Sequence, residues 1–405
     1  MTMSFFASVP ALPDDPIFGL PALFAADPHP KKVNLGIGVY KDADGKTIVL
    51  NVVRKAEELL LKQNLDKDYL FIDGNQKYIQ QSLELIFGKN CPGIESKEIY
   101  AAQTVGGTGS LRLGSEFLAQ EPSRTIFISE FTWPNHKPIF LRAGLVVENY
   151  DYYDHKAHKL DFPKFCKSIQ SINPGSVIML QACCHNPTGI DPTFEQWKEL
   201  SDLIKKQKII PFFDFAYQGF SEDLEKDAKA VRYFYEQGHE MLVSYSFSKN
   251  FGLYGERVGL LAVVTHDAAV AKKVGSQVKQ IIRGMYSNPP LQGARIVSTV
   301  LQSPELTKEW LEELKDMRTR VQDMRETLVA NLMVGAKHHD FTFLNRQKGL
   351  FSFCGLSHEQ VMHLKKEFGI YMPDNGRINV AGLNPYNMDY VVKSILSVFP
   401  STLKT

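Results

Sequence analysis

The sequence predicts an α/β fold, in which helices cover a mostly parallel β-sheet. Two observations carry this prediction. Apolar strand-like runs alternate with amphipathic helix-like runs along much of the chain. The chain also has 405 residues with 44% hydrophobic content, which is enough to bury a large core. We therefore expect one large domain and a smaller one.

The expected elements follow one another in a regular order. A helix-like run at 193–207 separates two apolar runs, as in units whose strands are parallel. A long charged amphipathic run at 305–332 precedes a second group of short strands and helices from Phe341 onward, so we expect a connecting helix that leads into a smaller C-terminal domain. The expected strands are residues 125–129, 176–184, 208–217, 241–248 and 258–264.

Charge and cysteine content narrow the choice of partner and compartment. Lys and Arg total 46 and Asp and Glu total 45, so the net charge of +1 provides no long-range field for nucleic acid or an anionic membrane surface. The five cysteines are odd in number and show no CxxC spacing, which indicates reduced thiols. Residues 1–24 contain prolines and acids where a signal peptide would be apolar. We expect a cytoplasmic protein with a small-molecule partner.

Lys249 is the first candidate catalytic residue. It follows a strand-like run in SYSFSKNFGLYGERVG (244–259) and opens a turn that contains glycine. A lysine at the end of a strand can hold its amine in a pocket, and Arg257 supplies a permanent cation suited to a phosphate. A solvated surface lysine is the alternative for Lys249 taken alone. The pairing predicts a Schiff-base lysine beside an anchored phosphate.

Two more expected strands end in polar residues that would lie at the same edge of the sheet. Asn186 follows the strand at 176–184, in HNPTG, where a proline can form a fixed and even cis turn. Asp214 lies among aromatic residues in the strand at 208–217, with Tyr217 three residues further on. A buried carboxylate needs a cationic partner, and a protonated pyridine nitrogen would serve.

A glycine-rich turn that leads into a helix, QTVGGTGSLRLGSEFLAQ (103–120), offers backbone amides at Gly107 and the Thr108 hydroxyl to an anion. The turn resembles a dinucleotide fingerprint, but Arg112 replaces the third glycine, so a nicotinamide dehydrogenase fits less well. His358 and His363 miss the spacing of a helical zinc pair, and we expect no metal site. No GxSxG motif supports a hydrolase.

Seven segments of the chain resemble segments of one family, the class I aspartate and aromatic-amino-acid aminotransferases. They occur in the family's order and at about its intervals: SYSFSKNFGLYGERVG, CCHNPTGIDP, FFDFAYQGF, GGTGSLR, TWPNH, YSNPP and GRINVAG. The resemblance runs from about Asp15 to the C-terminus. It implies a PLP-dependent transferase fold of type I, with a mainly parallel seven-stranded sheet that carries helices on both faces, plus a smaller α/β domain. PLP is pyridoxal 5'-phosphate, the implied cofactor.

The resemblance also implies roles for single residues. Lys249 would hold PLP as a Schiff base and shuttle the substrate proton, and Asp214 would keep the ring nitrogen protonated so that the ring withdraws electrons. Asn186 and Tyr217 match the groups that bond the ring oxygen. Trp133, in TWPNH, would stack on the ring face beside the substrate.

The remaining implied roles concern the phosphate and the substrate. The phosphate would be bound by Gly107, Thr108, Ser246 and Arg257, joined by Tyr69 of the other subunit of a homodimer with shared active sites. The substrate α-carboxylate would be bound by Arg377, near Gly38 and Asn186. The substrate's distal end would be met across the dimer by Arg283, Ser287 and Asn288.

Domain boundaries and two departures complete the comparison with the family. The large PLP-binding domain is expected at 46–310, and the N-terminal arm and small domain at 1–45 and 311–405. Gln181 stands where close relatives often have histidine, and Gly255 replaces a commoner asparagine. Neither departure removes a catalytic group, but both bear on the tuning of the cofactor.

We therefore expect a transaminase that moves the amino group between L-aspartate, an aromatic amino acid or both and 2-oxoglutarate, in a ping-pong cycle through Lys249. Main activity on tyrosine and phenylalanine is one alternative, and another PLP reaction on the same fold, such as decarboxylation or elimination, is a second. A non-catalytic regulatory protein would have lost Lys249 or gained a DNA-binding domain, and neither is seen.

Overall fold

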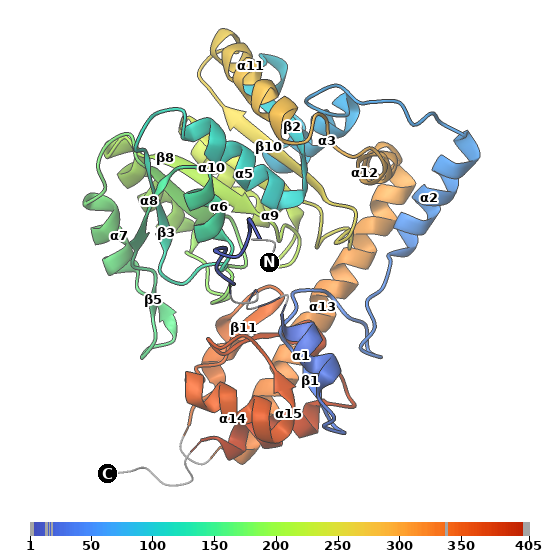
Figure 1. Cartoon of the computed structure of the whole chain (residues 1–405), viewed down its shortest axis with the longest axis vertical. Coiled ribbons are helices and arrows are strands. Elements are labelled where there is room, and N and C mark those ends of the chain that lie inside the picture. The colour runs from blue at the N-terminus through green and yellow to red at the C-terminus, as the bar shows by residue number, and fades with distance from the viewer. Residues whose placement is uncertain (1–3, 13–14, 16, 18, 337–338, 400–405) are drawn as a thin grey trace.

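A seven-stranded sheet forms the centre of the larger body of the molecule (Figure 1). The structure is a computed structural model and describes residues 4–12, 15, 17, 19–336 and 339–399. Neighbouring strands run parallel except β10, which is antiparallel to both of its neighbours. In spatial order the strands are β2 (Ile99–Val105), β10 (Val258–Val264), β9 (Met241–Ser246), β8 (Ile210–Phe215), β7 (Val177–Gln181), β3 (Thr125–Ser129) and β4 (Val146–Tyr150).

Helices cover both faces of this sheet, as predicted. One apolar cluster joins the sheet to α5 (Gly106–Leu118), α6 (His136–Arg142) and α11 (Ala268–Met285). A second, larger cluster lies on the other face and continues into the smaller body. Its helices on the sheet are α3 (Gln76–Phe87), α7 (Phe162–Gln170), α8 (Phe194–Lys206), α10 (Lys229–Glu236) and α12 (Gln292–Gln302). The strands are therefore buried from both sides, which explains their apolar runs.

Local sequence sets the ends of several elements. Thr193 and Gln196 form a capping box that starts α8 one residue inside the predicted helix. The predicted strands at 125–129 and 258–264 are confirmed at their stated bounds. The predicted strand at 176–184 ends earlier, at Gln181, because the chain then turns into the HNPTG loop. The strands predicted at 208–217 and 241–248 also end two residues early, at Phe215 and Ser246.

A single long helix, α13 (Pro304–Gly335), joins the sheet body to the smaller body below it (Figure 1). Ser303 caps its first turn by accepting from the backbone N–H of Leu306, and Pro304 suits its first position. The helix starts and ends close to the bounds of the predicted connecting helix. It runs on through residue 310, and the domain boundary predicted there stays a prediction.

The smaller body combines the two ends of the described chain. Its first pair of strands is parallel and joins β1 (Val33–Asn34) to β12 (Ile370–Tyr371), and the second is antiparallel and joins β11 (Phe351–Phe353) to β13 (Arg377–Asn379). Its helices are α1 (Leu20–Ala26), α14 (His358–Phe368) and α15 (Met388–Ser397), with short 3-10 turns at Thr342–Arg346 and Val380–Gly382. Elsewhere lie α2 (Asn51–Gln63), α4 (Pro92–Glu95), α9 (Leu224–Asp227) and the hairpin of β5 (Tyr153–Asp154) and β6 (Lys159–Leu160).

Candidate active site

A cavity of about 560 Å³ opens where the carboxyl ends of β7, β8 and β9 meet the smaller body. Parallel neighbours end at the same edge of a sheet, so residues that follow separate strands come together here. The predicted site residues that line the cavity are Gly38, Gly107, Thr108, Trp133, Asn186, Asp214, Tyr217, Ser246, Lys249, Arg257 and Arg377.

Four predicted site residues do not line this cavity: Tyr69, Arg283, Ser287 and Asn288. Tyr69 is 88% exposed. Arg283 lies on the exposed side of α11, where its guanidinium donates to the Ser287 hydroxyl. The single chain therefore places these side chains outside its own cavity.

Lys249 lies just beyond β9 with its amine 5.3 Å from the centre of the Tyr217 ring. Burial, together with the nearby cations Arg257 and Arg377, lowers the pKa of the Lys249 amine to about 8, although Asp214 acts in the opposite direction. The amine therefore has a substantial neutral fraction near physiological pH, which is the form that attacks a carbonyl carbon.

Asp214 belongs to a chain of hydrogen bonds behind the cavity. Its Oδ2 lies 3.0 Å from Nε2 of His136, and Nδ1 of His136 lies 2.7 Å from the Thr132 hydroxyl. The imidazole is fully buried, with the Trp133 ring 5.4 Å away and edge-on to it. Asp214 itself faces the cavity. Its carboxylate is therefore held in place from behind and can meet a cation in front.

Backbone amides and a cation form an anion site at the start of α5. Gly107 and Thr108 stand in its first turn, opposite Ser246 at the end of β9. A Cβ on Gly107 would lie 3.1 Å from Cβ of Ser246, and one on Gly106, where φ is +66°, would lie 2.5 Å from a guanidinium nitrogen of Arg257. Glycine at position 106 allows this close approach, and the Arg257 guanidinium, whose Nη1 donates to the Tyr254 carbonyl at 2.9 Å, stands where a phosphate at this turn would meet it.

Arg377 is a buried cation with an open bonding position. Its Nη1 donates to Asn186 Oδ1 at 3.1 Å and its Nη2 to the Gly36 carbonyl at 2.5 Å, while its buried Nε has no partner in the structure. Among the described residues it makes no ion pair with a carboxylate. Burial lowers its pKa to about 10. Such a guanidinium favours an incoming carboxylate, because an unpaired buried charge is costly.

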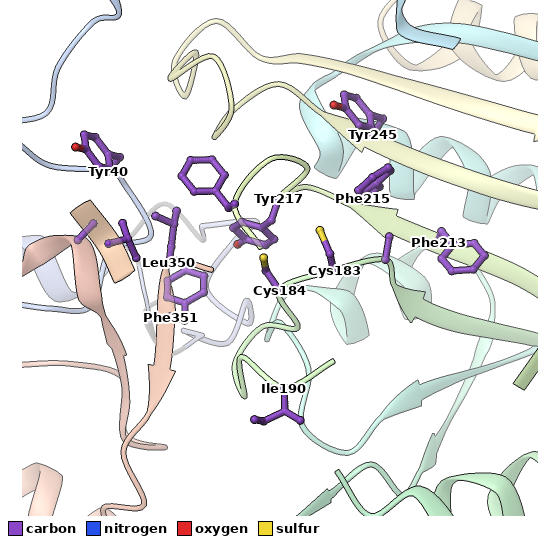
Figure 2. Close-up of a cluster of buried hydrophobic side chains, with 14 of the residues drawn as sticks. Tyr40, Cys183, Cys184, Ile190, Phe213, Phe215, Tyr217, Tyr245, Leu350 and Phe351 are labelled. Carbon is purple, nitrogen blue, oxygen red and sulfur yellow. The ribbon is translucent and has the colours of Figure 1, made fainter. Parts of the chain in front are cut away.

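The ring of Phe351, on β11, packs against the guanidinium of Arg377. The Arg377 guanidinium carbon lies 4.1 Å from the ring centre. Figure 2 shows the Tyr217 ring near this Phe351 ring, and the two meet edge-on with their centres 5.9 Å apart. A Cβ on Gly38 would lie 2.6 Å from the tip of this ring, so glycine is required there. The surroundings of Arg377 are thus built from both bodies of the molecule.

Sequence reasoning missed His136, Phe351 and Ser248 as members of the site. His136 is part of the TWPNH segment, and its place one turn after Thr132 was the available signal. Ser248 lies next to Lys249 and lines the cavity. No sequence signal identified Phe351, because only the packing of the smaller body brings it to the cavity.

The two departures from the family pattern differ in their surroundings. Gln181 lines the cavity and is 7% exposed. A Cβ on Gly255 would meet no atom within 4 Å, so a larger residue would fit there without a clash. The Asn186–Pro187 peptide bond is cis, as the sequence allowed.

The chain belongs to the aminotransferase class I and II family, whose model matches residues 30–395. It is therefore an aminotransferase, and its cofactor is pyridoxal phosphate. The type I transferase fold predicted from the sequence is confirmed.

Relatives of known name cover nearly the whole chain. Aspartate aminotransferase of Salmonella typhi is 48% identical over 97% of this chain and 100% of its own length. A crystal structure of aromatic-amino-acid aminotransferase from Burkholderia pseudomallei, covalently bound to pyridoxal phosphate, is 44% identical, with a TM-score of 0.95 over 98% of this chain and 100% of its own. The aromatic amino acid aminotransferase from Psychrobacter sp. B6, cocrystallised with aspartic acid, is 40% identical, with a TM-score of 0.95 over 97% and 99% of the two chains.

The cavity fits this cofactor in three places. Arg257 and the Gly107 turn suit a phosphate, Asp214 suits a protonated ring nitrogen, and the Lys249 amine suits the aldehyde carbon. Within the ranges that the structure describes, no group of three or more His, Cys, Asp or Glu side chains is arranged to hold a metal ion. In those same ranges, no helix has both the length and the apolar character needed to cross a membrane.

Proposed function

We propose that this aminotransferase moves the amino group between L-aspartate and 2-oxoglutarate, and that it also accepts aromatic amino acids. The observation that carries the proposal is the arrangement of Arg377, with its unpartnered Nε, beside the buried Lys249 amine in one cavity. An α-carboxylate bound at Arg377 would bring the neighbouring Cα and amino group toward Lys249.

The predicted site residues that line the cavity each have a chemical role in this proposal. When bound, the cofactor carries the amino group between the two substrates and withdraws electrons from the substrate Cα. Lys249 holds the cofactor and moves the proton on and off Cα. Asp214 holds the proton on the ring nitrogen, and Trp133 covers the ring. Asn186 and Tyr217 bond the ring oxygen.

The phosphate and the substrate carboxylate occupy separate parts of the cavity. Gly107, Thr108, Ser246 and Arg257 bind the phosphate through N–H, hydroxyl and guanidinium donors. Arg377 binds the α-carboxylate, with Asn186 fixing one side of its guanidinium and Gly38, beside the substrate, leaving room for the Phe351 ring.

We also propose a homodimer with shared active sites. Supporting this, the described lining of the cavity holds only two arginines, Arg257 and Arg377, and these are assigned to the phosphate and the α-carboxylate. A second carboxylate on the substrate would need another cation. Arg283, with Ser287 and Asn288, lies outside the cavity and could supply it to a neighbour, as Tyr69 could supply its hydroxyl to the neighbour's phosphate. Exposed apolar side chains near Tyr69, such as Leu65 and Phe71, would be covered in such a dimer.

The cytoplasm is the compartment we propose, because all five cysteines are free thiols, as expected under reducing conditions. Main activity on tyrosine or phenylalanine is the second candidate function. The likeness to solved aromatic-amino-acid aminotransferases supports it. One of those enzymes was cocrystallised with aspartic acid, which agrees with the first candidate.

The test is a pair of single-turnover measurements on the purified enzyme. The visible absorption band of the bound cofactor should be lost when aspartate is added and restored by 2-oxoglutarate. Release of carbon dioxide instead would favour decarboxylation. The values of kcat/KM for aspartate and phenylalanine, each with 2-oxoglutarate, then decide between the two candidate substrates.

A further inference from the structure

Gln181 lines the cavity next to both Asp214 and Asn186. It is the last residue of β7 and stands directly opposite Asp214 on β8 in the parallel register. Its Oε1 accepts from the backbone N–H of Asn186 at 2.8 Å. Its Nε2 donates to the Asn186 carbonyl at 3.0 Å and to the Thr132 hydroxyl at 3.4 Å. Both amide protons and one lone pair of Oε1 are therefore directed at two neighbours, Asn186 and Thr132.

The backbone of Asn186 dictates the orientation of the Gln181 amide. A peptide N–H can only donate and a peptide carbonyl can only accept, so Oε1 must face the first and Nε2 the second. The second proton on Nε2 is then directed at Thr132. Because an amide does not ionise, this orientation is the same at every pH at which the protein is folded.

The orientation of Gln181 decides where the Thr132 proton goes. In the described part of the chain, the Thr132 hydroxyl has two partners, Gln181 and His136. Since it accepts from Gln181, the one partner left for its single proton among the described residues is Nδ1 of His136, 2.7 Å away. Nδ1 is then an acceptor, and the ring proton is on Nε2, where it is donated to Asp214 at 3.0 Å.

Two other titratable groups face the His136 ring. Asp214 accepts from Nε2 at 3.0 Å. Burial and the neighbouring His136 lower the pKa of His185 to about 3, so His185 adds no charge there near neutral pH. On the Nδ1 side the partner of the ring is the Thr132 hydroxyl, at 2.7 Å.

We propose that Gln181 is a positioning residue that, through Thr132, keeps Nδ1 of His136 without a proton. The same residue connects the hydrogen bonds around His136 to the Asn186–Arg377 pair. The ring proton is then on Nε2, where it is donated to Asp214, whose carboxylate faces the cavity. The same amide holds the Asn186 backbone, whose side chain accepts from Arg377. The part of the proposal about substrate rests on the proposed function; the part about His136 does not.

The direct test is a long-range proton–nitrogen spectrum of the holoenzyme with nitrogen-15 histidine, in which His136 is identified by its loss in a His136→Asn variant. Nδ1 of the unsubstituted protein should resonate as an unprotonated nitrogen near neutral pH. Gln181→Glu should reverse the direction of these hydrogen bonds. A carboxylate at this position accepts the Thr132 proton, and the Thr132 oxygen then accepts from Nδ1–H of His136. Gln181→Met, which cannot donate, should likewise allow a proton on Nδ1.

Gln103 provides the matched control. It is 1% exposed on β2, accepts from a backbone N–H at 3.0 Å and donates to a backbone carbonyl at 2.6 Å, but it does not line the cavity. Gln103→Glu and Gln103→Met should leave the His136 nitrogens as they are in the unsubstituted protein. A protonated Nδ1 in the unsubstituted protein, or an unprotonated Nδ1 in every Gln181 variant that folds, would overturn the assignment.

A kinetic measurement tests the connection to Asn186. Gln181→Met removes two hydrogen bonds from the Asn186 backbone, so KM for aspartate should rise about 3- to 10-fold, by more than kcat falls. If Gln181→Met altered the His136 spectrum but left KM for aspartate unchanged, the proposed connection from Gln181 through Asn186 to Arg377 would be refuted. If the enzyme instead proves to use a different substrate, the His136 spectrum still stands as measured, so the two failures can be told apart.

Discussion

Arg377 and Asn186 are 191 positions apart in the chain, yet Nη1 of Arg377 donates to the side-chain oxygen of Asn186 at 3.1 Å. Arg377 lies on β13 of the smaller body, and Asn186 follows β7 of the sheet. The proposed carboxylate site therefore depends on how the two bodies are placed relative to each other. Its geometry reports on their relative position.

Lys249→Ala should still bind pyridoxal phosphate through the Gly107 turn and Arg257, but without a covalent link. Turnover should fall by at least about 10²- to 10⁴-fold, because a positioned acid–base group is lost together with the attachment of the cofactor. Mass spectrometry after borohydride reduction checks the link, and steady-state assays check turnover. Near-normal activity in the purified variant would refute the role of Lys249.

The pKa of Lys249 predicts how its reaction with the cofactor depends on pH. Only the neutral amine attacks an aldehyde, and burial lowers the pKa of this amine from 10.5 to about 8. The rate at which cofactor-free protein forms the covalent link should therefore rise with pH and level off above about 8. Stopped-flow absorbance measures it. A rate that keeps rising toward pH 10 would show that the amine is not buried in solution.

Arg283→Ala should separate dicarboxylate from aromatic substrates. Loss of one partner of a buried charge pair costs about 2 to 5 kcal/mol, or about 30- to several thousand-fold in kcat/KM for aspartate. Phenylalanine forms no such pair, so its half-reaction should change far less. Single-turnover loss of the cofactor band measures both. An equal fall for the two substrates would mean that Arg283 serves the structure instead.

Mixed dimers test whether the sites are shared. Lys249→Ala and Arg283→Ala subunits should together rebuild one intact site, because the two residues would belong to the same site only across the dimer. Lys249→Ala mixed with Arg377→Ala should restore little, since both residues serve the site of their own chain. Activity is measured after subunit exchange has been confirmed by native mass spectrometry. No recovery in the first mixture would argue against sharing.

Strands buried on both faces could be predicted well, because their apolar runs are continuous, as in Val258–Val264. The prediction missed β2 and β4. β2 carries the polar pair Gln103 and Thr104, which the fold buries, and β4 is an edge strand with Val146 43% exposed. Neither has the pattern of a central strand, and only pairing with neighbours defines them.

The site residues likewise fall into those that the sequence could indicate and those that it could not. Residues that follow strands, such as Asp214 and Lys249, carry a signal in the sequence, because parallel strands bring their ends together. His136 and Phe351 carry none of this kind. Their places depend on a helix packed behind the sheet and on the docking of a separate body, which are tertiary contacts.

The uninterrupted course of α13 has a mechanical consequence. A helix of 32 residues at 1.5 Å per residue is about 48 Å long. If it turns as a stiff rod, a rotation of about 5° at one end moves the other end by about 4 Å, more than the length of a hydrogen bond. Small changes in the angle between α13 and the larger body would thus move the smaller body, and Arg377 with it, relative to Asn186.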